Sequence, residues 1–391
     1  MKKRTIVHVN AIYLKLTFIY FFIKNLKLNN HYFLTREIKK GALDKFPFER
    51  VVKTSDLFYP FWLFNKFLNV KFDFMFMRNP LAQITAIKKI GRIDLLHAHF
   101  GTEGYYTLPL ARYFKVPLIV TFYGYDMSMI PKKQAWKNRY RELFDKVSII
   151  CVEGEYMKRK MIELGCIEDK LFVCRLAIPL SEIKFSYRPE FITSLNVLMC
   201  ANFVEKKGYF DALDTIKKLK DDGIKVNCEI IGDGQLIRKI KERIDHLQIS
   251  DEVKLLGRKN SLEIYEISEK HHVFFHPSKF GPDGDSEGGA PTIISEMQAL
   301  GLPVISTTHA DIPNNIPVEN HMLAEEGNIE QLVEIFKNFI ACKQNWNKIA
   351  DLGRKFVEEK HDAVAIGMRL EQLYETVIKS SEAERLVNTL N

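Results

Sequence analysis

The sequence has few cysteines, and they form neither a disulfide framework nor a metal-binding pattern. The six cysteines include no Cys-x-x-Cys pair, and no His/Cys cluster has the spacing of zinc ligands. Reduced thiols within strands and helices are the simpler interpretation. Because such thiols persist in a reducing compartment, the sequence predicts a cytoplasmic protein.

Long apolar runs are also absent. The longest uncharged apolar run near the start covers residues 16–23, between Lys15 and Lys24, and is far shorter than the ~20 residues that a membrane-spanning helix needs. We therefore expect no transmembrane helix and no signal peptide. The chain has 391 residues, more than one hydrophobic core usually organises, so two domains are expected.

Acidic residues are scarce at the start of the chain. Residues 1–80 contain 15 Lys or Arg against 5 Asp or Glu, whereas the rest contains 42 against 44. Residues 57–78 interleave aromatic side chains with Lys66, Lys71 and Arg78, which is typical of a peripheral surface for anionic lipids on the inner face of a membrane. A buried pair of aromatic-rich helices would give the same pattern. No recognition motif accompanies the basic residues, so we expect no nucleic-acid partner.

Short apolar runs alternate with amphipathic helical patterns along the chain, which is typical of parallel sheets covered by helices on both faces. In the first half, this pattern predicts strands at residues 5–9, 93–100, 117–123 and 147–152, and a helix at 102–114. In the second half, it predicts strands at residues 196–200, 226–231, 253–255, 273–276 and 303–306.

A polar, proline-containing stretch at residues 186–194 separates the two halves and predicts a hinge near Pro189. The expected domains are 1–185 and 186–362, followed by a C-terminal helix and tail at 363–391. The predicted fold class is α/β, with two facing Rossmann-like doubly wound domains. Because ligands of open α/β sheets bind beyond the carboxyl ends of the strands, we expect the site in the cleft between the domains.

The most informative segment covers residues 283–307, where an acidic, glycine-rich loop precedes a predicted helix and a buried strand. Pro291 suits the first helical turn, and Gly288 and Gly289 allow close approach of a ligand to the backbone. The N–H groups of this helix start favour a diphosphate, to which Thr292 adds a hydroxyl.

Two carboxylates flank the predicted diphosphate pocket. Glu296 lies in the second helical turn and leans towards the N-terminus, where a ribose diol is a plausible partner. Glu287 lies on the preceding loop, where it would accept hydrogen bonds from sugar hydroxyls. The two carboxylates would therefore bracket a nucleotide-sugar donor.

This segment resembles the signature of the retaining glycosyltransferases of family four, whose two-domain fold is called GT-B, and in particular members that build bacterial exopolysaccharides. Other stretches resemble family elements in the same order along the chain. They are residues 16–20 (LTFIY), 94–104 (DLLHAHFGTEG), 120–126 (VTFYGYD), 202–213 (NFVEKKGYFDAL) and 230–244 (IIGDGQLIRKIKERI). The resemblance also implies that a helix at 363–379 crosses back onto the first domain.

The resemblance implies a hexosyltransferase and assigns roles to residues of this chain. The expected catalytic residues are Glu287, Lys207, His99 and Asp126. The expected donor-binding residues are Glu296, Gly288, Gly289, Ala290, Pro291, Thr292, Lys206, Gly232, Asp233 and Gly234. The donor is expected to be a UDP- or GDP-sugar, used without a cofactor or metal, since Asp283 and Asp285 fit a glycine-rich turn better than a cation site.

One spacing and two positions depart from the family pattern. Glu287 and Glu296 enclose eight residues where the family has seven, Asn202 stands in place of an arginine, and Tyr123 stands in place of a histidine. The departures leave Lys207, with Lys206, to neutralise the donor phosphates.

The resemblance further implies transfer with retention, in which an oxygen of the leaving phosphate takes the proton of the acceptor hydroxyl. The expected acceptor is a saccharide or a polyprenyl-diphosphate-linked saccharide of bacterial surface polysaccharide synthesis. Two other classes remain open: a sugar-nucleotide epimerase or phosphorylase on the same fold, and a catalytically silent donor-binding scaffold.

Overall fold

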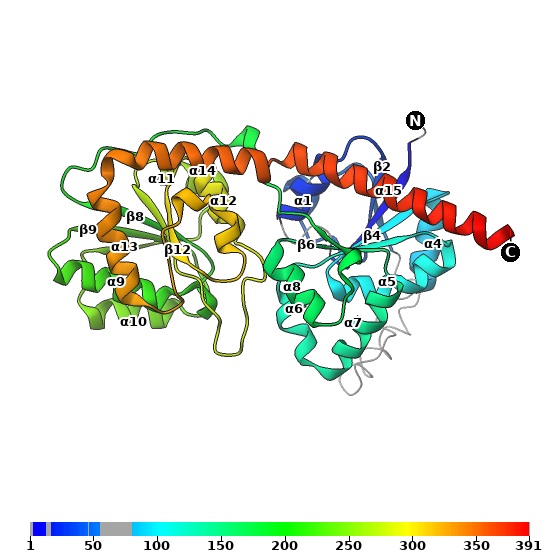
Figure 1. The fold of residues 1–391 in the computed structure, drawn as a ribbon, viewed down its shortest axis with the longest axis horizontal. Helices are drawn as coiled ribbons and strands as arrows, with labels where there is room; N and C mark the ends of the chain where they lie inside the picture. Colours follow the sequence, from blue (N-terminus) through cyan, green and yellow to red (C-terminus); the bar gives the residue numbers. More distant parts are fainter. Residues whose placement is uncertain (1–2, 13–16, 46, 55–79, 391) are drawn as a thin grey trace. The chain divides into compact units, whose positions relative to one another are not determined.

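The chain forms two α/β units, which the computed structural model describes at residues 3–12, 17–45, 47–54 and 80–390 (Figure 1). Unit 1 comprises residues 1–153, 158–177 and 363–391, and unit 2 comprises residues 154–157 and 178–362. The predicted lipid-binding surface at residues 57–78 lies outside the described residues.

Unit 1 is built on a seven-stranded parallel sheet in the order β3-β2-β1-β4-β5-β6-β7. Its strands are β1 (Thr5–Val9), β2 (Asn30–Thr35), β3 (Val51–Lys53), β4 (Leu95–His99), β5 (Leu118–Thr121), β6 (Ile149–Val152) and β7 (Leu171–Val173). Its central strands are buried on both faces, as expected for parallel strands covered by helices on two sides, and most of their buried side chains are apolar.

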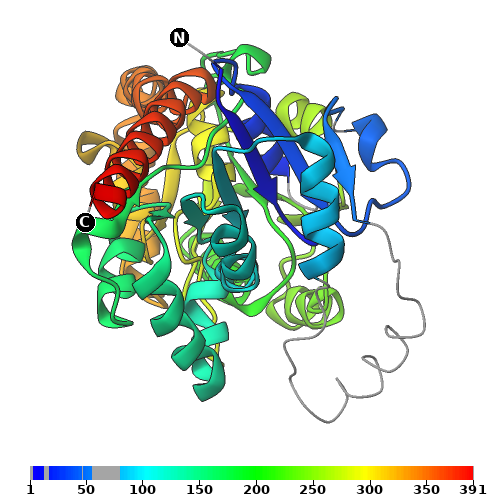
Figure 2. The same cartoon turned by 90° about the vertical axis from the view of Figure 1, so that its right-hand side faces the viewer.

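The helices of this half of the chain follow the strands in alternation. They are α1 (Thr17–Lys24), α2 (Ala42–Lys45), α4 (Pro80–Ile90), α5 (Gly101–Phe114), α6 (Tyr125–Ser128), α7 (Gln134–Lys146) and α8 (Glu155–Glu163). The last helix, α15 (Ala363–Leu390), returns to unit 1 and packs beside α1 on one face of the first sheet (Figure 2). The predicted crossover to the first domain is therefore confirmed, and the helix extends past residue 379.

Unit 2 contains a six-stranded parallel sheet in the order β10-β9-β8-β11-β12-β13. Its strands are β8 (Leu195–Cys200), β9 (Val226–Ile231), β10 (Val253–Gly257), β11 (Val273–His276), β12 (Val304–Thr307) and β13 (Leu323–Ala324). Its helices are α9 (Tyr209–Asp221), α10 (Ile237–Leu247), α11 (Ser261–Ser268), α12 (Thr292–Ala299), α13 (Ile329–Ala341) and α14 (Trp346–Lys360). Both units therefore have the doubly wound order predicted from the sequence.

The structure moves the first domain boundary to residues 177/178 from the predicted 185/186. Ile178, Leu180 and Ile183 are buried in a hydrophobic cluster of unit 2, so the segment before residue 186 already belongs to that core. Pro189, where a hinge was expected, consequently lies inside unit 2. The second boundary, at residues 362/363, coincides with the predicted one.

The sequence patterns did not indicate four strands, three of which lie at the sheet edges. These are β2, β3, β7 and β13, and three of them have only two or three residues. Such short segments carry too few residues to show a periodicity of two. None of the described helices combines the length and apolarity that a membrane crossing requires.

A chain of buried hydrogen bonds runs through unit 1, on the face of the sheet that α15 covers. Glu371 Oε1 on α15 lies 3.0 Å from His31 Nε2, and His31 Nδ1 lies 3.1 Å from His8 Nε2. His8 Nδ1 lies 3.2 Å from His99 Nε2, and His99 Nδ1 lies 2.7 Å from the hydroxyl of Tyr123. The contacts join α15 to strands β2, β1 and β4.

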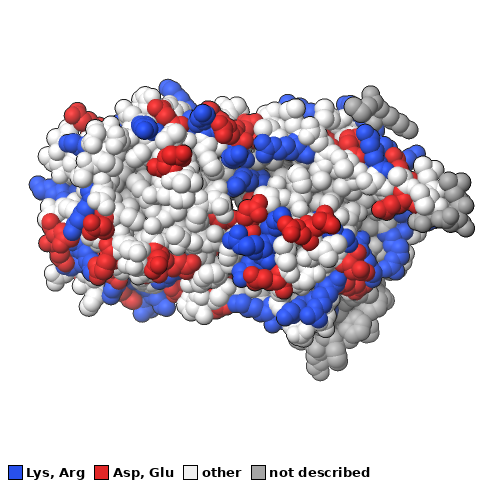
Figure 3. Space-filling view, viewed as in Figure 1, with Lys and Arg blue, Asp and Glu red and all other residues white. Residues whose placement is uncertain are grey.

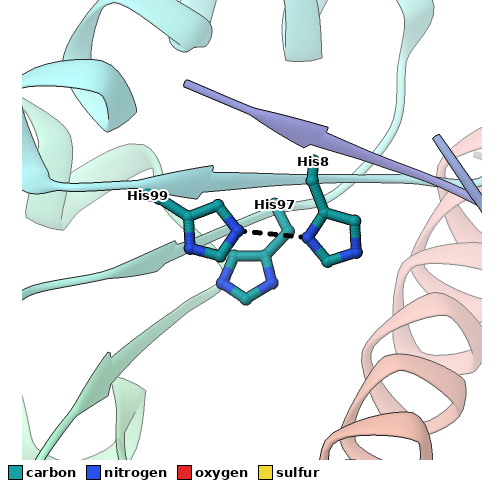
Figure 4. A group of neighbouring side chains, drawn as sticks. All are labelled: His8, His97 and His99. Atoms are coloured by element: carbon teal, nitrogen blue, oxygen red, sulfur yellow. Dashed lines mark hydrogen bonds between the residues drawn. The ribbon is translucent and has the colours of Figure 1, made fainter. Parts of the chain in front are cut away.

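A fourth histidine, His97, packs against this chain (Figure 4). Its Nδ1 lies 2.7 Å from the hydroxyl of Tyr374, and its Nε2 lies 2.7 Å from Thr121 Oγ1. The facing ring nitrogens of His8, His97 and His99 lie within 4.8 Å of one another, which is close enough to suggest a metal site. Every ring nitrogen of the three is hydrogen-bonded to protein, so an ion would have to displace these bonds, and we assign the cluster to a hydrogen-bonded core.

Acidification should destabilise unit 1 through these histidines. Burial lowers the pKa of His8 and His97 well below the usual value and lowers that of His99 to about 3. Below about pH 6.5, the pKa of a histidine in the unfolded chain, the unfolded chain therefore binds more protons than the folded one. The free energy of unfolding should then decrease as the pH is lowered. The limiting slope is about 1.4 kcal/mol per pH unit for each histidine.

Urea unfolding between pH 7.5 and 5.5 would measure this slope. The substitution His246→Gln changes an exposed histidine and should leave the slope unchanged. A free energy of unfolding that stays constant over this range would contradict the burial of three neutral imidazoles.

Candidate functional site

The second sheet reverses its strand order between β8 and β11, and the residues predicted to bind the donor follow these two strands. Strands β9 and β10 lie on one side of β8, whereas β11, β12 and β13 lie on the other. Segments that follow adjacent strands diverge at such a point, which is where open α/β sheets bind ligands. Lys206 and Lys207 follow β8, and the loop at residues 277–291 follows β11.

The two segments approach each other closely along their backbones. The amide of Lys279 donates to the carbonyl of Lys206 at 3.0 Å. Gly208, with φ of 66°, lies so close to Pro277 that a Cβ atom would stand 1.8 Å from the carbonyl oxygen of Pro277. A glycine is therefore required at position 208, directly after the lysine pair.

The carboxylate of Glu287 lies at the centre of this group. Lys207 Nζ lies 2.7 Å from its Oε1 and 2.9 Å from its Oε2, and the Ser278 hydroxyl donates to Oε1 at 2.7 Å. His276 Nε2 lies 3.8 Å from the same oxygen, beyond hydrogen-bond distance. Burial raises the pKa of Glu287, but Lys207, His276 and Lys206 together outweigh burial and hold the pKa well below the usual value, with Lys207 the largest of the three. The structure thus joins two predicted catalytic residues, Glu287 and Lys207, in one ion pair.

The neighbouring lysine is held by the same loop. Lys206 Nζ lies 3.1 Å from Asp285 Oδ2 and donates to the carbonyl of Ser286 at 2.8 Å. Asp283 Oδ1 accepts the amide of Asp285 at 3.0 Å, which makes it a turn residue. Asp285 is therefore paired with Lys206, and Asp283 shapes the turn.

The loop ends at the start of helix α12. Pro291 is the N-cap residue and the helix begins at Thr292, one residue later than predicted, and the N-cap makes no side-chain hydrogen bond. The predicted residues Gly288, Gly289 and Ala290 lead directly into this N-terminus. Amide groups and the positive end of the helix dipole favour an anion there.

Glu296 lies in the second turn of α12 and is half-buried. The hydroxyl of Tyr265, on α11, donates to Glu296 Oε2 at 3.2 Å. Burial raises the pKa of Glu296, opposed in part by Tyr265. The Tyr265 contact uses one of the two carboxylate oxygens, so Glu296 can accept a further hydrogen bond on the other.

The predicted Gly-Asp-Gly element supports the segment that follows β8. The carbonyl of Asp233 accepts the amide of Phe203 at 2.8 Å, and its side chain accepts the amide of Gly234 at 2.8 Å. A Cβ atom at Gly232 would lie 2.0 Å from the carbonyl oxygen of Ala201. Asp233 thus shapes the turn, and both glycines allow the backbones to approach.

Sequence reasoning missed several residues around Glu287. Ser278 and His276 contact or face its carboxylate, and His309 accepts its backbone amide at 3.2 Å. Of these, His276 carried a signal, because it ends a predicted strand beside the site. His309 is 22 residues further along the chain than Glu287, and no pattern in the sequence joins them.

The two catalytic residues predicted in the first domain both lie within unit 1. His99 is fully buried in the histidine chain. Both carboxylate oxygens of Asp126 accept backbone amides, from Gly101 at 2.7 Å and from Tyr123 at 2.8 Å. Burial raises the pKa of Asp126 to about 6. Asp126 therefore braces the turns that follow β4 and β5.

Residues 189–356 match the family model described as "Glycosyl transferases group 1". The chain is also 29% identical over 232 residues to a putative colanic acid biosynthesis glycosyltransferase of Escherichia coli, covering 58% of this chain and 56% of that protein. It is 32% identical over 258 residues to an amylovoran biosynthesis glycosyltransferase of Erwinia amylovora, covering 65% and 63%. The matched regions thus span less than two thirds of each of these relatives.

Solved structures with the same fold include Anabaena HepE in complex with UDP and glucose. Its TM-score is 0.73 at 14% identity, covering 95% of this chain and 99% of that one. The apo form of a lipopolysaccharide outer core galactosyltransferase has a TM-score of 0.69 at 13% identity, covering 95% and 99%. Residues 189–356 therefore match the Glycosyl transferases group 1 family, and the two Rossmann-like units have the fold of GT-B glycosyltransferases.

Proposed function

We propose that this protein is a retaining glycosyltransferase of family four, which transfers a hexose from a nucleotide sugar to an acceptor. The observation that carries the proposal is the arrangement of Lys207, Glu287 and the start of α12 at the switch point of the second sheet. The glycosyltransferase names of the relatives support transfer over epimerisation, phosphorolysis or a silent scaffold.

In this proposal, the diphosphate of the donor lies at the N-terminus of α12, near Lys206 and Lys207. Glu296 accepts hydrogen bonds from the ribose diol, and Glu287 faces the sugar. HepE structures contain UDP and UDP-glucose, which favours a UDP-sugar donor here. No step in this scheme uses a metal ion or a cofactor.

The proposed reaction forms a bond between the acceptor oxygen and the anomeric carbon while the bond from that carbon to the diphosphate breaks. The acceptor proton passes to an oxygen of the leaving phosphate, so the products are a glycoside and a nucleoside diphosphate. Lys207 and the α12 amides would stabilise the charge that develops on the diphosphate. Because Lys207 already contacts Glu287, a diphosphate would share this ammonium with a carboxylate.

We propose that the acceptor is a saccharide or a polyprenyl-diphosphate-linked saccharide of bacterial surface polysaccharide synthesis. The names of the colanic acid and amylovoran relatives support this class of product.

On the face drawn in Figure 3, basic and acidic side chains are interspersed. Peripheral binding to an anionic membrane through residues 57–78, in a cytoplasmic protein, stays a prediction.

Donor binding should depend on Glu296. A thermal-shift screen would compare UDP, GDP, ADP and their sugar conjugates as ligands. The UDP-sugar that binds, at 100 times its dissociation constant, should stabilise the wild type by about 2.7 kcal/mol. Hydrogen bonds to a charged group contribute about 1.5–3 kcal/mol, so Glu296→Ala should weaken binding roughly 10- to 150-fold. The matched control is Glu266→Gln, at an exposed position next to Tyr265. Wild-type affinity in Glu296→Ala would exclude the ribose contact.

Turnover should depend on Lys207. Removal of one charge-stabilising donor costs roughly 2.7–4 kcal/mol in other enzymes, so Lys207→Met should lower kcat/KM by about 100-fold or more. Release of nucleoside diphosphate in the presence of an acceptor would measure this effect. Lys207→Arg keeps the charge and should be less impaired, and Lys239→Met, at an exposed position, should be unimpaired. Full activity of Lys207→Met would contradict the proposed role.

The same substitution should change how stability depends on pH. In the wild type, the pKa of Glu287 is lowered in the folded state, so its stabilising effect is present above the unfolded value of about 4.3 and is lost as the pH falls through the folded value. Without Lys207, the largest influence that lowers the pKa of Glu287 is lost, so burial is less well opposed and this pKa rises relative to the wild type. Urea unfolding should therefore show that Lys207→Met is destabilised more at pH 7 than at pH 4.

A further inference from the structure

One carboxylate outside the predicted site holds both ends of the loop that carries Glu287. Glu326, in the loop after β13, accepts the backbone amide of Phe280 on its Oε2 at 2.9 Å. Its Oε1 lies 2.7 Å from Nδ1 of His309, which is fully buried after β12. Nε2 of His309 in turn accepts the backbone amide of Glu287 at 3.2 Å. Residues 280 and 287 are thus tied to the same side chain, one directly and one through an imidazole.

The chemistry of these groups fixes the direction of the hydrogen bonds. A backbone amide only donates, so Nε2 of His309 must be the unprotonated nitrogen that accepts from Glu287. Nδ1 then carries the proton and donates to Glu326, whose carboxylate only accepts. The pair therefore works as an acceptor for Glu287 only while His309 is neutral with its proton on Nδ1.

The backbone beside His309 adds a second observation. Ala310 has a φ of 48°, in the left-handed region that residues other than glycine rarely adopt. Such conformations persist where the surrounding structure holds them in place, and they are concentrated at functional sites. The turn that follows β12 is thus held in an unfavourable backbone conformation next to the imidazole that contacts Glu287.

The loop itself is internally folded between its two attachment points. The amide of Gly281 donates to the carbonyl of Asp285 at 2.8 Å, and the amide of Gly284 donates to the carbonyl of Gly281 at 2.8 Å. A compact turn held at residues 280 and 287 leaves little freedom for the peptide of Glu287. The carboxylate of Glu287 is then directed towards Lys207 and Ser278.

We infer that Glu326 and His309 are positioning residues that set the place of Glu287 in the donor-sugar site. This inference rests on the proposed function, because it assigns Glu287 to the sugar and the α12 N-terminus to the diphosphate. Eight residues separate Glu287 from Glu296 in this chain, so the loop before α12 is long, and the two attachments restrain it at Glu287. Neither residue contacts the donor; both act through the backbone of the 280–287 loop.

A pair of substitutions separates the two contacts of His309. In His309→Gln, the side-chain carbonyl can replace Nε2 as the acceptor for the Glu287 amide. In His309→Asn, the shorter side chain can reach Glu326 but cannot reach Glu287. Glu326→Gln should have an intermediate effect on UDP-sugar binding, because a side-chain amide has only one oxygen that accepts and cannot accept from both Phe280 and His309. Glu325→Gln is the matched control at an adjacent exposed glutamate.

The measurement is isothermal titration of each variant with UDP and with UDP-glucose, UDP-galactose and UDP-N-acetylglucosamine. For the sugar nucleotide that the wild type binds best, His309→Asn should bind at least tenfold more weakly, with UDP affinity within twofold of the wild type. His309→Gln and Glu325→Gln should stay within threefold for both ligands. Equal weakening for UDP and the UDP-sugar, or no weakening in His309→Asn, would overturn the inference.

Hydrogen exchange provides a readout that does not depend on nucleotide binding. Amide protection of the peptide covering residues 278–291 should fall in His309→Asn and be retained in His309→Gln, with thermal unfolding confirming that both variants are folded. If the wild type binds no nucleotide, the proposed function fails. Protection that is unchanged in His309→Asn would instead overturn the positioning role by itself.

Discussion

The ion pair between Lys207 and Glu287 is the interaction on which the candidate site depends. Its two residues are 80 positions apart, and they join the segment after β8 to the loop after β11. A buried carboxylate is costly unless it is paired and hydrogen-bonded, and Glu287 has an ammonium and the Ser278 hydroxyl as partners. The backbones can come this close because position 208 is glycine. The pair therefore exists only when both segments are folded.

Both units use a buried or half-buried carboxylate to fix a histidine and nearby backbone amides. Glu371 accepts the amide of Leu28 at 2.9 Å and lies beside His31 at the end of the unit 1 histidine chain. Glu326 does the same in unit 2 with Phe280 and His309. Because an ionised carboxylate only accepts, it determines which ring nitrogen carries the proton. Each carboxylate thereby holds the neighbouring imidazole and backbone amides in one hydrogen-bonded arrangement.

Much of the fold could be predicted from the sequence, since its central strands are short, mostly apolar runs that alternate with amphipathic helical patterns. The strands at residues 5–9, 226–231 and 273–276 were predicted with their observed ends, whereas the short edge strand β13 left no periodic pattern. The boundary near residue 185 was wrong because Ile178, Leu180 and Ile183 pack into unit 2, and a polar stretch in the sequence marks a loop rather than the limit of a core. Such patterns cannot reveal contacts between side chains from distant segments, such as the one between Lys207 and Glu287.

The sequence by itself determined the chemical inventory of the candidate site. Glu287, Glu296 and the glycine-rich start of α12 could be named because their local spacing places them on one loop and one helix, whereas Lys207 could be named because the family resemblance implies its role. Only the tertiary structure decided that Lys207 pairs with Glu287, that Asp126 braces two turns, and that Glu326 and His309 hold the loop. The physical reason is that parallel strands bring segments far apart in the chain to one sheet edge, where hydrogen bonds depend on distance in space and not on spacing in sequence.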